Sequence, residues 1–457
     1  MFWGHGHTLR HILSYKVTTS DSKCDLQGEA VPAGAGPTTH FHGDIDVKMS
    51  NSKPQIVLAA LVCHAVALWP CVAHAQLTAP HEAARIEFGP LSVYPTLRII
   101  DAGKDRNVFN DESNPREDFT FTVASRVLGV LKLGLNELMF SSGNDYVWFR
   151  DFAEERSSNT RYAARFNLSA SKLKPFFGVD RQQTRSRPNP EIDARARRLD
   201  RSAVAGFTLS TADRTAITAS ASVDDSSFDA GQLYRGVDLA ASLNRVGRSV
   251  SAGIRYKVTP LTSFLINANY GEDRFPDSHI RDSRAYSVVP AFEFSPDAAI
   301  HGRLGIGVEK FQPLDVTLPA SIGAVYDANL NWSLFGRTTF DLNGSRDTRY
   351  SYQDTQPYYL ITGARLNVAQ HLFGPLDLLG GIDWEHLSYR WHRDIERHPD
   401  ALDASNTITD LSAGFAVNLR RSFRITLVAD QTQRRSTQDF KQNFRRTRLL
   451  SSVTLGS

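Results

Sequence analysis

The residues best suited to chemistry in this chain are six arginines gathered in one polar stretch, which runs from Arg185 to Arg201 as RSRPNPEIDARARRLDR. A guanidinium group is a planar fork of donors that matches carboxylates and phosphates, so such a stretch can bind anions. Two interpretations stay open. Either the stretch folds inward and contacts an anionic sugar, or it is an outer loop whose arginines pair with its own acidic residues. Those acidic residues are Glu191, Asp193 and Asp200.

Histidines and clustered aspartates are the other residues that could do chemistry. His301 falls on the predicted polar face of a strand, and no sequence pattern pairs it with a serine, as nucleophilic catalysis requires. Three histidines recur every six residues: His386, His392 and His398. At strand rise that spacing is about 20 Å, too far to share a metal ion. One acidic cluster fits no calcium-loop spacing: Asp224, Asp225 and Asp229. We therefore predict no catalytic residue, no metal site and no cofactor, and hence no enzyme.

The elements that must position these side chains are β-strands. Apolar and polar residues alternate strictly in several segments, among them 249–258 and 410–420. A period of two places the two sets on opposite faces of a strand, and no segment shows a sustained helical period. The face opposite the apolar one carries Ser, Thr, Asn, Asp and Arg, which suits water better than a packed core. This pattern favours a barrel in a membrane over a soluble sandwich or propeller.

Short and long connections alternate between the predicted strands. The short turns are 169–171, 211–214, 259–261, 295–297, 333–336, 370–374 and 420–422. The longer polar stretches are 103–116, 151–158, 185–198, 226–243, 272–282, 312–320, 345–356, 393–405 and 438–443. We therefore predict an all-β fold, a single transmembrane antiparallel up-and-down β-barrel of about 18 strands, or else 16, with long outer loops and short periplasmic turns.

Aromatic residues gather near both kinds of connection, as two interfacial girdles at opposite ends of the strands require. Those near the short turns are Phe292, Phe294, Trp332, Phe335, Phe373 and Phe423. Those near the long loops are Tyr146, Trp148, Phe149, Tyr270, Tyr350, Tyr358, Tyr359, Tyr389 and Trp391. We expect both groups to mark the boundaries of a membrane.

The predicted lumen face carries charges of both signs. Its basic residues are Arg161, Arg165, Lys174, Arg255, Lys257, Arg303, Arg365 and Arg424. Its acidic residues are Asp180, Asp224, Glu293, Glu309, Asp327, Asp383, Glu385, Asp410 and Asp430. A mixed lining argues against strong ion selectivity, and it fits either an open lumen or one narrowed by ion pairs. The candidate anion contacts in lumen or loop are Arg185, Arg187, Arg195, Arg197, Arg198 and Arg303.

An apolar segment from Ile56 to Gln76 has the layout of a secretory signal. It follows Lys53, and small residues at Ala73 and Ala75 place the cleavage before Gln76. All three cysteines precede this site, so the exported chain would hold no disulfide. The net charge of +3 gives no reason to expect a nucleic-acid partner. We expect an upstream extension or disordered leader over 1–48, a signal peptide over 49–75, a short periplasmic segment over 76–90 and the barrel over 91–457.

Several loop and strand-end motifs resemble one known family. They are Phe88-Gly-Pro-Leu-Ser-Val, Asp105-Arg-Asn-Val-Phe109, Asp145-Tyr-Val-Trp-Phe149, Glu155-Arg-Ser-Ser-Asn159, Arg185-Ser-Arg-Pro188, Glu191-Ile-Asp-Ala-Arg195 and Gln356-Pro-Tyr-Tyr359. Over nearly the whole exported chain, the sequence resembles the outer-membrane β-barrel porins of the BBP2 type. The resemblance implies a channel. Some members of that family occur in exopolysaccharide-export gene clusters, so the resemblance also makes polysaccharide export a specific hypothesis.

The residue patterns and the resemblance together predict a channel in the outer membrane of a Gram-negative (diderm) bacterium. It would pass small solutes or exported polysaccharide passively through a polar lumen. The alternative is a closed structural or adhesion barrel that binds partners through its outer loops. The expected partners are outer-membrane lipid and lipopolysaccharide, the outer-membrane barrel assembly machinery, and polysaccharide, with no nucleic acid.

Overall fold

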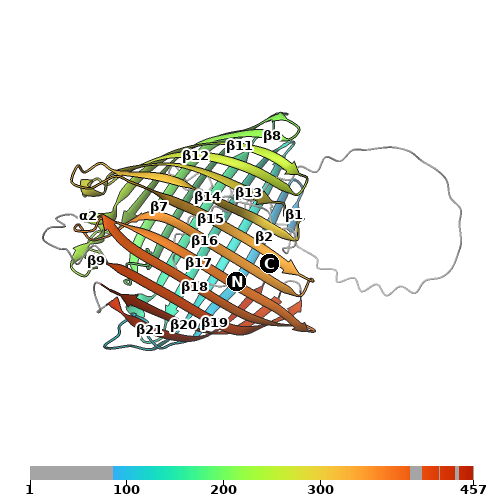
Figure 1. The fold of residues 1–457 in the computed structure, drawn as a ribbon. Coiled ribbons are helices and arrows are strands. Elements are labelled where there is room, and N and C mark those ends of the chain that lie inside the picture. Colours follow the sequence, from blue (N-terminus) through green and yellow to red (C-terminus); the bar gives the residue numbers. More distant parts are fainter. Residues whose placement is uncertain (1–85, 392–403, 421–422, 438–441, 456–457) are drawn as a thin grey trace, which may run out of the picture. The chain divides into compact units, whose positions relative to one another are not determined.

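The computed structural model describes residues 86–391, 404–420, 423–437 and 442–455. The predicted leader and signal peptide lie outside these residues, so both stay predictions. The described residues form one antiparallel sheet of 19 strands (Figure 1). A closed ring contains 18 of them, because the last strand, β21, pairs with β2, and the extra strand is β1. The prediction of an all-β antiparallel barrel of about 18 strands is confirmed.

Each strand of the ring pairs with the next along the chain. The first half comprises β2 (Leu91–Asp105), β3 (Asp118–Leu133), β4 (Asn136–Phe149), β5 (Ser157–Asn167), β6 (Leu173–Ser186), β7 (Ala196–Ala212), β8 (Thr215–Phe228), β11 (Arg245–Thr259) and β12 (Thr262–Arg274). The second half comprises β13 (Ser283–Phe294), β14 (Ile300–Pro313), β15 (Ser321–Leu334), β16 (Thr338–Tyr350), β17 (Tyr358–Phe373), β18 (Leu376–Trp391), β19 (Ser405–Arg420), β20 (Phe423–Ser436) and β21 (Phe444–Leu455).

The remaining elements are short. They are β1 (Ile86–Phe88), the hairpin of β9 (Leu233–Tyr234) and β10 (Val237–Asp238), the helix α2 (Leu239–Leu243), and two 3-10 turns, η1 (Ala153–Glu155) and η2 (His279–Arg281). The Asp238 side chain caps α2 by accepting a hydrogen bond from the backbone N–H of Ala240 at 2.9 Å. In the described part of the chain, no helix is long and apolar enough to cross a membrane.

The connections at the two ends of the barrel differ in length, as predicted (Figure 1). At one end the turns are short, such as Pro260–Leu261 between β11 and β12. At the other end the connections are longer, such as 187–195 between β6 and β7. The turn at Gly134 and Leu135 was not among the predicted short turns, although Gly134 has a φ of +64° that favours glycine. The predicted loop over 345–356 is wrong for residues 345–350, because β16 continues to Tyr350.

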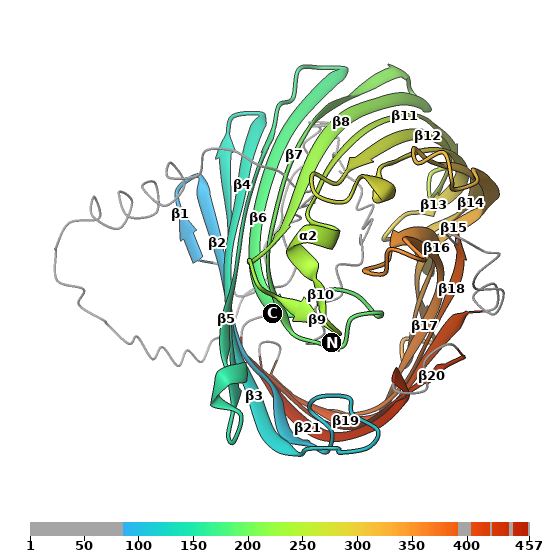
Figure 2. The ribbon, with the colours of Figure 1, turned by 90° about the vertical axis from the view of Figure 1, so that its left-hand side faces the viewer.

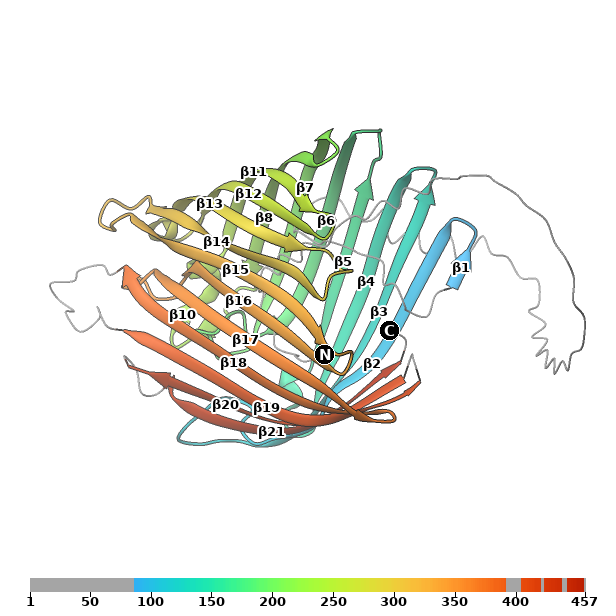
Figure 3. The ribbon, with the colours of Figure 1, turned by 45° about the vertical axis from the view of Figure 1, so that its right-hand side comes forward.

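The seam between β2 and β21 contains the main irregularity of the ring. A bulge interrupts the register of β2 at Asp101, which has a φ of +55°. Two serines of β21 hold this bulge: Ser452 accepts a hydrogen bond from the Asp101 N–H at 3.3 Å, and Ser451 donates one to the Ala102 carbonyl at 2.8 Å. On the edge of β2 that faces β21, the first residues of β2 pair with β1 instead (Figure 3). The pairing of β2 with β21 begins only at Leu97.

Side chains alternate between an apolar outer face and a polar inner face. On β11, Val250 and Ile254 are exposed on the outside. Arg255, the next residue, points inward and forms a 2.7 Å ion pair with Glu293 of β13. Inward ion pairs of this kind also join Arg303 to Asp327 at 3.0 Å. The lumen wall is therefore lined by paired charges of both signs.

The aromatic residues follow the girdle expectation at the short-turn end but only in part near the long loops. There Phe292, Phe335 and Phe373 are exposed, as lipid-facing girdle residues should be. Near the long loops Tyr146 is also exposed, but four of the expected girdle residues are buried: Phe149, Tyr358, Tyr359 and Tyr389. The expectation is wrong for these four, because the long connections fold over the lumen and cover them.

Closure at the seam gives a first prediction. A Cβ atom at Gly103 would overlap the backbone carbonyl of Leu449 on β21, so Gly103→Ala must push the two seam strands apart. We expect it to destabilise the folded barrel by about 1–3 kcal/mol, the usual cost of overpacking. Gly271→Ala is the matched control, because nothing lies within 4 Å of a Cβ atom there. The denaturant midpoint of the folded barrel would be measured for both, and equal midpoints would contradict the prediction.

Candidate functional site at the loop end of the lumen

The connection between β6 and β7, residues 187–195, crosses the lumen. The side chain of Glu191 reaches Tyr389 on β18, and Arg434 on β20 reaches the Glu191 carbonyl. In the ring of 18 strands, β18 lies about half the circumference away from β6 and β7, and β20 lies about a third away. Figure 2, which looks at the barrel from the loop end, shows β9, β10 and α2 inside the ring of strands. We call the three segments 187–195, 229–244 and 351–357 the constriction.

Glu191 fixes the tip of the first segment. Its side chain is completely buried, and its carboxylate accepts hydrogen bonds from Ser351 Oγ at 2.6 Å, Tyr389 OH at 2.8 Å and the backbone N–H of Tyr352 at 3.3 Å. A buried carboxylate is tolerated only when such donors satisfy it. Burial raises the pKa of Glu191 to about 7, although the hydrogen bonds and nearby Arg434 act in the opposite direction.

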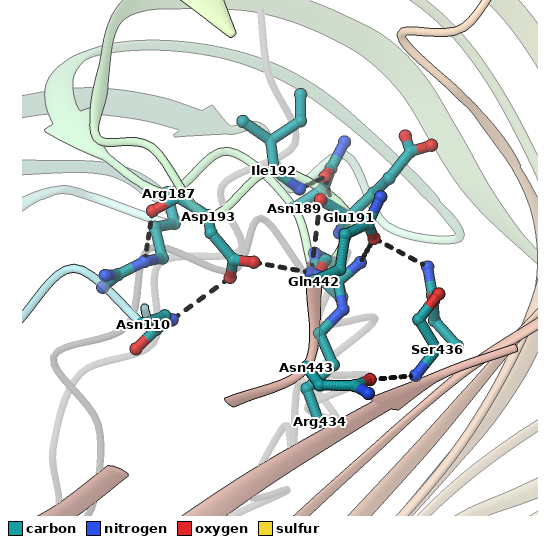
Figure 4. A network of polar contacts seen from close by, with 12 residues as sticks. Asn110, Arg187, Asn189, Glu191, Ile192, Asp193, Arg434, Ser436, Gln442 and Asn443 are labelled. Carbon is teal, nitrogen blue, oxygen red and sulfur yellow. Dashed lines mark hydrogen bonds and ion pairs between the residues drawn. The ribbon is translucent and has the colours of Figure 1, made fainter. Parts of the chain in front are cut away.

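Arg434 and Asp193 hold the same segment from the other side (Figure 4). The buried Arg434 guanidinium donates to Asp193 Oδ2 at 2.7 Å and to the Pro190 carbonyl at 3.2 Å. Asp193 Oδ1 accepts from Asn110 Nδ2 at 3.1 Å, which ties the segment to the connection between β2 and β3. Because each donor comes from a different part of the ring, displacement of the segment would break several bonds at once.

The tip is also shaped locally. The Asn189 side chain accepts hydrogen bonds from the backbone N–H groups of Glu191 and Ile192, both at 2.9 Å. This is ordinary Asx-turn chemistry, and prolines on both sides of Asn189 restrict the backbone further. The sequence Pro188-Asn-Pro190 therefore presents Glu191 at the end of a rigid turn.

A small apolar cluster joins the three segments of the constriction. Its buried members are Ile192, Ala196, Phe228, Tyr234, Leu239, Leu243 and Tyr352. The rings of Tyr234 and Tyr352 meet edge to face with their centroids 4.9 Å apart. Arg281 on η2 adds a fourth connection, since it donates to the Ser351 carbonyl at 2.7 Å. The constriction is thus one packed body with its own small core.

The candidate arginines of the sequence analysis lie in two places. Arg185 and Arg195 pair with Glu155 on η1 at 3.2 and 3.5 Å, and Arg198 pairs with Asp200 at 2.8 Å. Arg187 donates to the carbonyls of Asp193 and Val108 at 2.6 and 2.7 Å, while Arg197 is exposed.

Burial lowers the pKa of Arg187 and of Arg195 to about 10, so both stay charged at neutral pH. Arg303 is elsewhere, on the wall of β14. Anion binding by these residues stays a prediction.

The other candidates are dispersed. His301 lies on β14 with Arg303, and His386 contacts Thr407 at 3.0 Å, whereas His392 and His398 lie outside the described residues. Asp224 points inward to Arg245 at 3.2 Å, and Asp225, the next residue along β8, belongs to the other face. Within the described ranges, no group of three His, Cys, Asp or Glu side chains could hold a metal ion.

Sequence reasoning missed the residues that anchor the constriction, above all Arg434, Tyr389 and Ser351. It treated Glu191 only as a partner for neighbouring arginines. The one signal that could have helped is the cluster of tyrosines around Gln356-Pro-Tyr-Tyr359, because aromatic residues at a loop end can pack inward as well as face lipid.

The lumen wall outside the constriction offers exposed cations. The Arg126 and Arg161 side chains, on β3 and β5, are 54% and 55% exposed, and their nearest carboxylates, Asp145 and Asp180, lie 3.8 and 3.9 Å away. Arg161 also donates to Gln182 Oε1, but more than half of each side chain stays open to water and solutes in the lumen. These are the wall residues best placed to meet a passing molecule.

The buried Glu191 carboxyl makes docking of the segment pH-dependent. Its pKa is raised from an ordinary 4.5 to about 7, so docking is favoured as the pH falls through 7 and weakened as it rises. Arg434, Tyr352 and Tyr389 face the group, and neither arginine nor tyrosine changes its charge state over this range. We expect amide hydrogen exchange, corrected for intrinsic rates, to show greater protection of 187–195 at pH 5.5 than at pH 8.5.

Glu191→Gln should abolish this pH dependence, because the amide stays neutral. Glu137→Gln, near the short-turn end, is the control and should retain it. Equal protection of the wild-type segment at both pH values would show that the carboxyl does not govern docking.

The chain is similar to several solved structures of outer-membrane proteins at low sequence identity. None of the curated proteins matches the sequence. Among solved structures, a BenF-like porin from Pseudomonas fluorescens Pf-5 is 11% identical with a TM-score of 0.45, over 81% of this chain and 99% of that one. OpdK from Pseudomonas aeruginosa, solved with vanillate, is 11% identical with a TM-score of 0.43, over 80% and 99%. The FrpB iron transporter from Neisseria meningitidis is 10% identical with a TM-score of 0.39, over 75% and 62%.

The family comparison covers most of the chain. The model of the family described as "Putative beta-barrel porin 2" matches residues 79–456, which include every strand of the ring. Porins of this fold are channels rather than enzymes, in agreement with the prediction that the chain is not an enzyme. The chain belongs to this family of β-barrel porins.

Proposed function

We propose that the chain is a passive outer-membrane channel for small polar solutes. The observation that carries this proposal is the constriction, in which segment 187–195 crosses the lumen and is fastened to β18 and β20 by Glu191 and Arg434. A ring of 18 strands without such a segment is wide enough for a broad aqueous channel. With it, the passage at the loop end is narrowed, which limits the size of the solute that can cross.

The distribution of charge on the lumen wall favours the passage of solutes that carry little net charge or charges of both signs. Wall charges occur mostly as pairs, such as Arg303 with Asp327 and Arg255 with Glu293. Paired charges create strong local fields but little net field, so we expect weak ion selectivity. Arg126 and Arg161, which are more open to water, would orient a solute that carries a carboxylate.

The placement in an outer membrane is part of the proposal. It is supported by membership of the porin family, by the apolar outer face and by the difference in length between the two sets of connections. In this placement the long connections and the constriction lie at the outer surface, and the short turns lie in the periplasm.

Polysaccharide export is the less favoured role. A polymer would pass only if segment 187–195 left the lumen, which requires loss of the Glu191, Asp193 and Arg434 contacts together. No contact in the described part of the chain favours a closed adhesion barrel over a channel. Conductance measurements in planar bilayers distinguish both roles from that of a channel for small solutes.

A shortened connection tests the proposal directly. Ser186 and Ala196 are paired across β6 and β7, so residues 187–195 can be replaced by a short turn such as Asn-Gly without breaking the ladder. In planar bilayers, we expect the chain 76–457 to give stable single-channel steps that small sugars reduce. The shortened variant should conduct at least about twofold more and admit larger sugars, because the conducting cross-section widens.

The control removes 112–115, exposed residues of the connection between β2 and β3, and should leave conductance unchanged. Equal conductance of the shortened variant and the wild type would refute the constriction as the size filter. Silence of the wild-type barrel, once shown to be folded and inserted, would instead favour the closed barrel. Steps that appear only in the shortened variant would favour a gated port for a larger cargo.

A further inference from the structure

A belt of positive charge lies on the outer face of seven consecutive strands, β6 to β8 and β11 to β14. Its basic residues are Arg181, Arg201, Arg248, Arg274, Arg284 and Lys310, and its acidic residues are Asp225 and Glu272. We call these eight residues the outer belt. The outer belt thus holds six cations and two carboxylates, although the whole chain is close to neutral.

Strand alternation places the outer belt on the side away from the lumen. Arg248 is two residues from the exposed Val250, and Lys310 is two residues from the exposed Val308. On β6, Arg181 has the same parity as the exposed Phe177. These cations therefore belong to the lipid-facing set of side chains and not to the lumen wall.

Strand register makes the belt continuous. Arg181 is paired with Arg201, and Arg201 with Asp225. Farther along the ring, Glu272 is paired with Arg248 on one side and Arg284 on the other. Lys310 is paired with Tyr286, one step nearer the apolar band. Paired or adjacent residues of neighbouring strands thus carry the charges across seven of the 18 strands of the ring.

The height of the belt coincides with a membrane boundary. On each of these strands, four or five uncharged outward residues separate the belt residue from the short-turn end. That run spans about 26 Å or more along a tilted strand, which matches the apolar band of an outer-membrane barrel. Tyr270 and Tyr286 lie directly below the charges, with ring centroids 5.0 Å apart, as interfacial aromatic residues do.

The positive charge of the belt is only partly compensated. Glu272 accepts from Arg274 at 2.8 Å, Arg284 at 3.1 Å and Tyr270 OH at 2.9 Å. Arg274 also pairs with Asp282 at 3.3 Å. Arg248 and Lys310 are exposed, and neither forms an ion pair with any residue that the structure describes. A net positive surface therefore meets the head-group layer.

Outward cations are densest on this side of the barrel. The outward residues of β15, which follows the belt in the ring, include no charged side chain, and the same holds for β19. Outward cations also occur on other strands, such as Arg435 on β20 and Arg445 on β21, but six of them lie here on seven neighbouring strands. Their density on this side favours a ligand with negative charge at this height.

We propose that the outer belt binds the phosphate groups of a phosphorylated glycolipid, of the lipid A type, in the outer leaflet. Arginine forks hold phosphate oxygens in pairs, Lys310 adds a point charge, and the apolar band below accepts acyl chains. The inference rests on the outer-membrane placement proposed above but not on conduction. Occupancy by the glycolipid would fix one side of the barrel in the leaflet next to the constriction.

The test measures lipid binding by the folded chain 76–457 in detergent, by native mass spectrometry. The probes are bisphosphorylated lipid A, dephosphorylated lipid A and phosphatidylglycerol. We expect bisphosphorylated lipid A to bind at least about tenfold more tightly than either of the others. The variant R248Q/R284Q/K310Q should lose about tenfold in affinity for it, since three phosphate donors are removed.

The control is Arg435→Gln on β20, an exposed outward cation outside the belt, which should bind lipid A as the wild type does. Equal binding of phosphorylated and dephosphorylated lipid A, or of phosphatidylglycerol and lipid A, would overturn the proposal. So would wild-type affinity in the triple variant. The single-channel conductance of the triple variant in a bilayer without glycolipid should equal that of the wild type, which separates this proposal from the channel function.

Discussion

The need to pair every backbone N–H and C=O group within the sheet governs the whole structure. In a lipid environment an unpaired strand edge is not tolerated, so the sheet must close. Closure depends on a single seam, between β2 and β21, where β2 bulges at Asp101 and two serines of β21 satisfy the displaced backbone. Antiparallel closure in turn requires an even number of strands. Because strand direction alternates, successive connections lie at opposite ends, and here the long ones share one end and the short turns the other.

Closure also creates an inner face that must be filled or wetted. Most of it carries paired charges, but at the loop end the chain inserts its own connection. The fastening residue is a carboxylate, and it is satisfied by Ser351, Tyr389 and a backbone N–H instead of a direct cation. At the seam between β2 and β21, the buried Asp105 carboxylate is satisfied in the more usual way, by a bidentate ion pair with Arg446. Glu191 holds its segment without such a partner, so its attachment responds to protonation near neutral pH.

The sequence predicts the parts of this structure that depend on local chemistry. Alternation and turn residues are local, and they led to the strand count and to the positions of most turns. The constriction depends on contacts such as Glu191 with Tyr389, 198 residues apart, and nothing in the local pattern links those residues. The arginine stretch shows the same limit. The acidic residues nearest to it in the sequence were the expected partners. Arg185 and Arg195 instead form ion pairs with Glu155, on the long connection between β4 and β5.

Alternation also explains why overall charge is a poor guide to the partners of a barrel. Each strand sends successive residues to opposite faces, so inward arginines meet inward carboxylates and their charges cancel across the lumen. Outward charges have no such constraint, because their neighbours on the outer face are mostly apolar. Arg248 and Lys310 are exposed there, while Arg255, on the same strand as Arg248, is paired with Glu293 inside. A net charge of +3 therefore describes the sum of two surfaces with different partners. Near-neutrality of the whole chain is compatible with one face that attracts phosphate and another that is almost indifferent to charge.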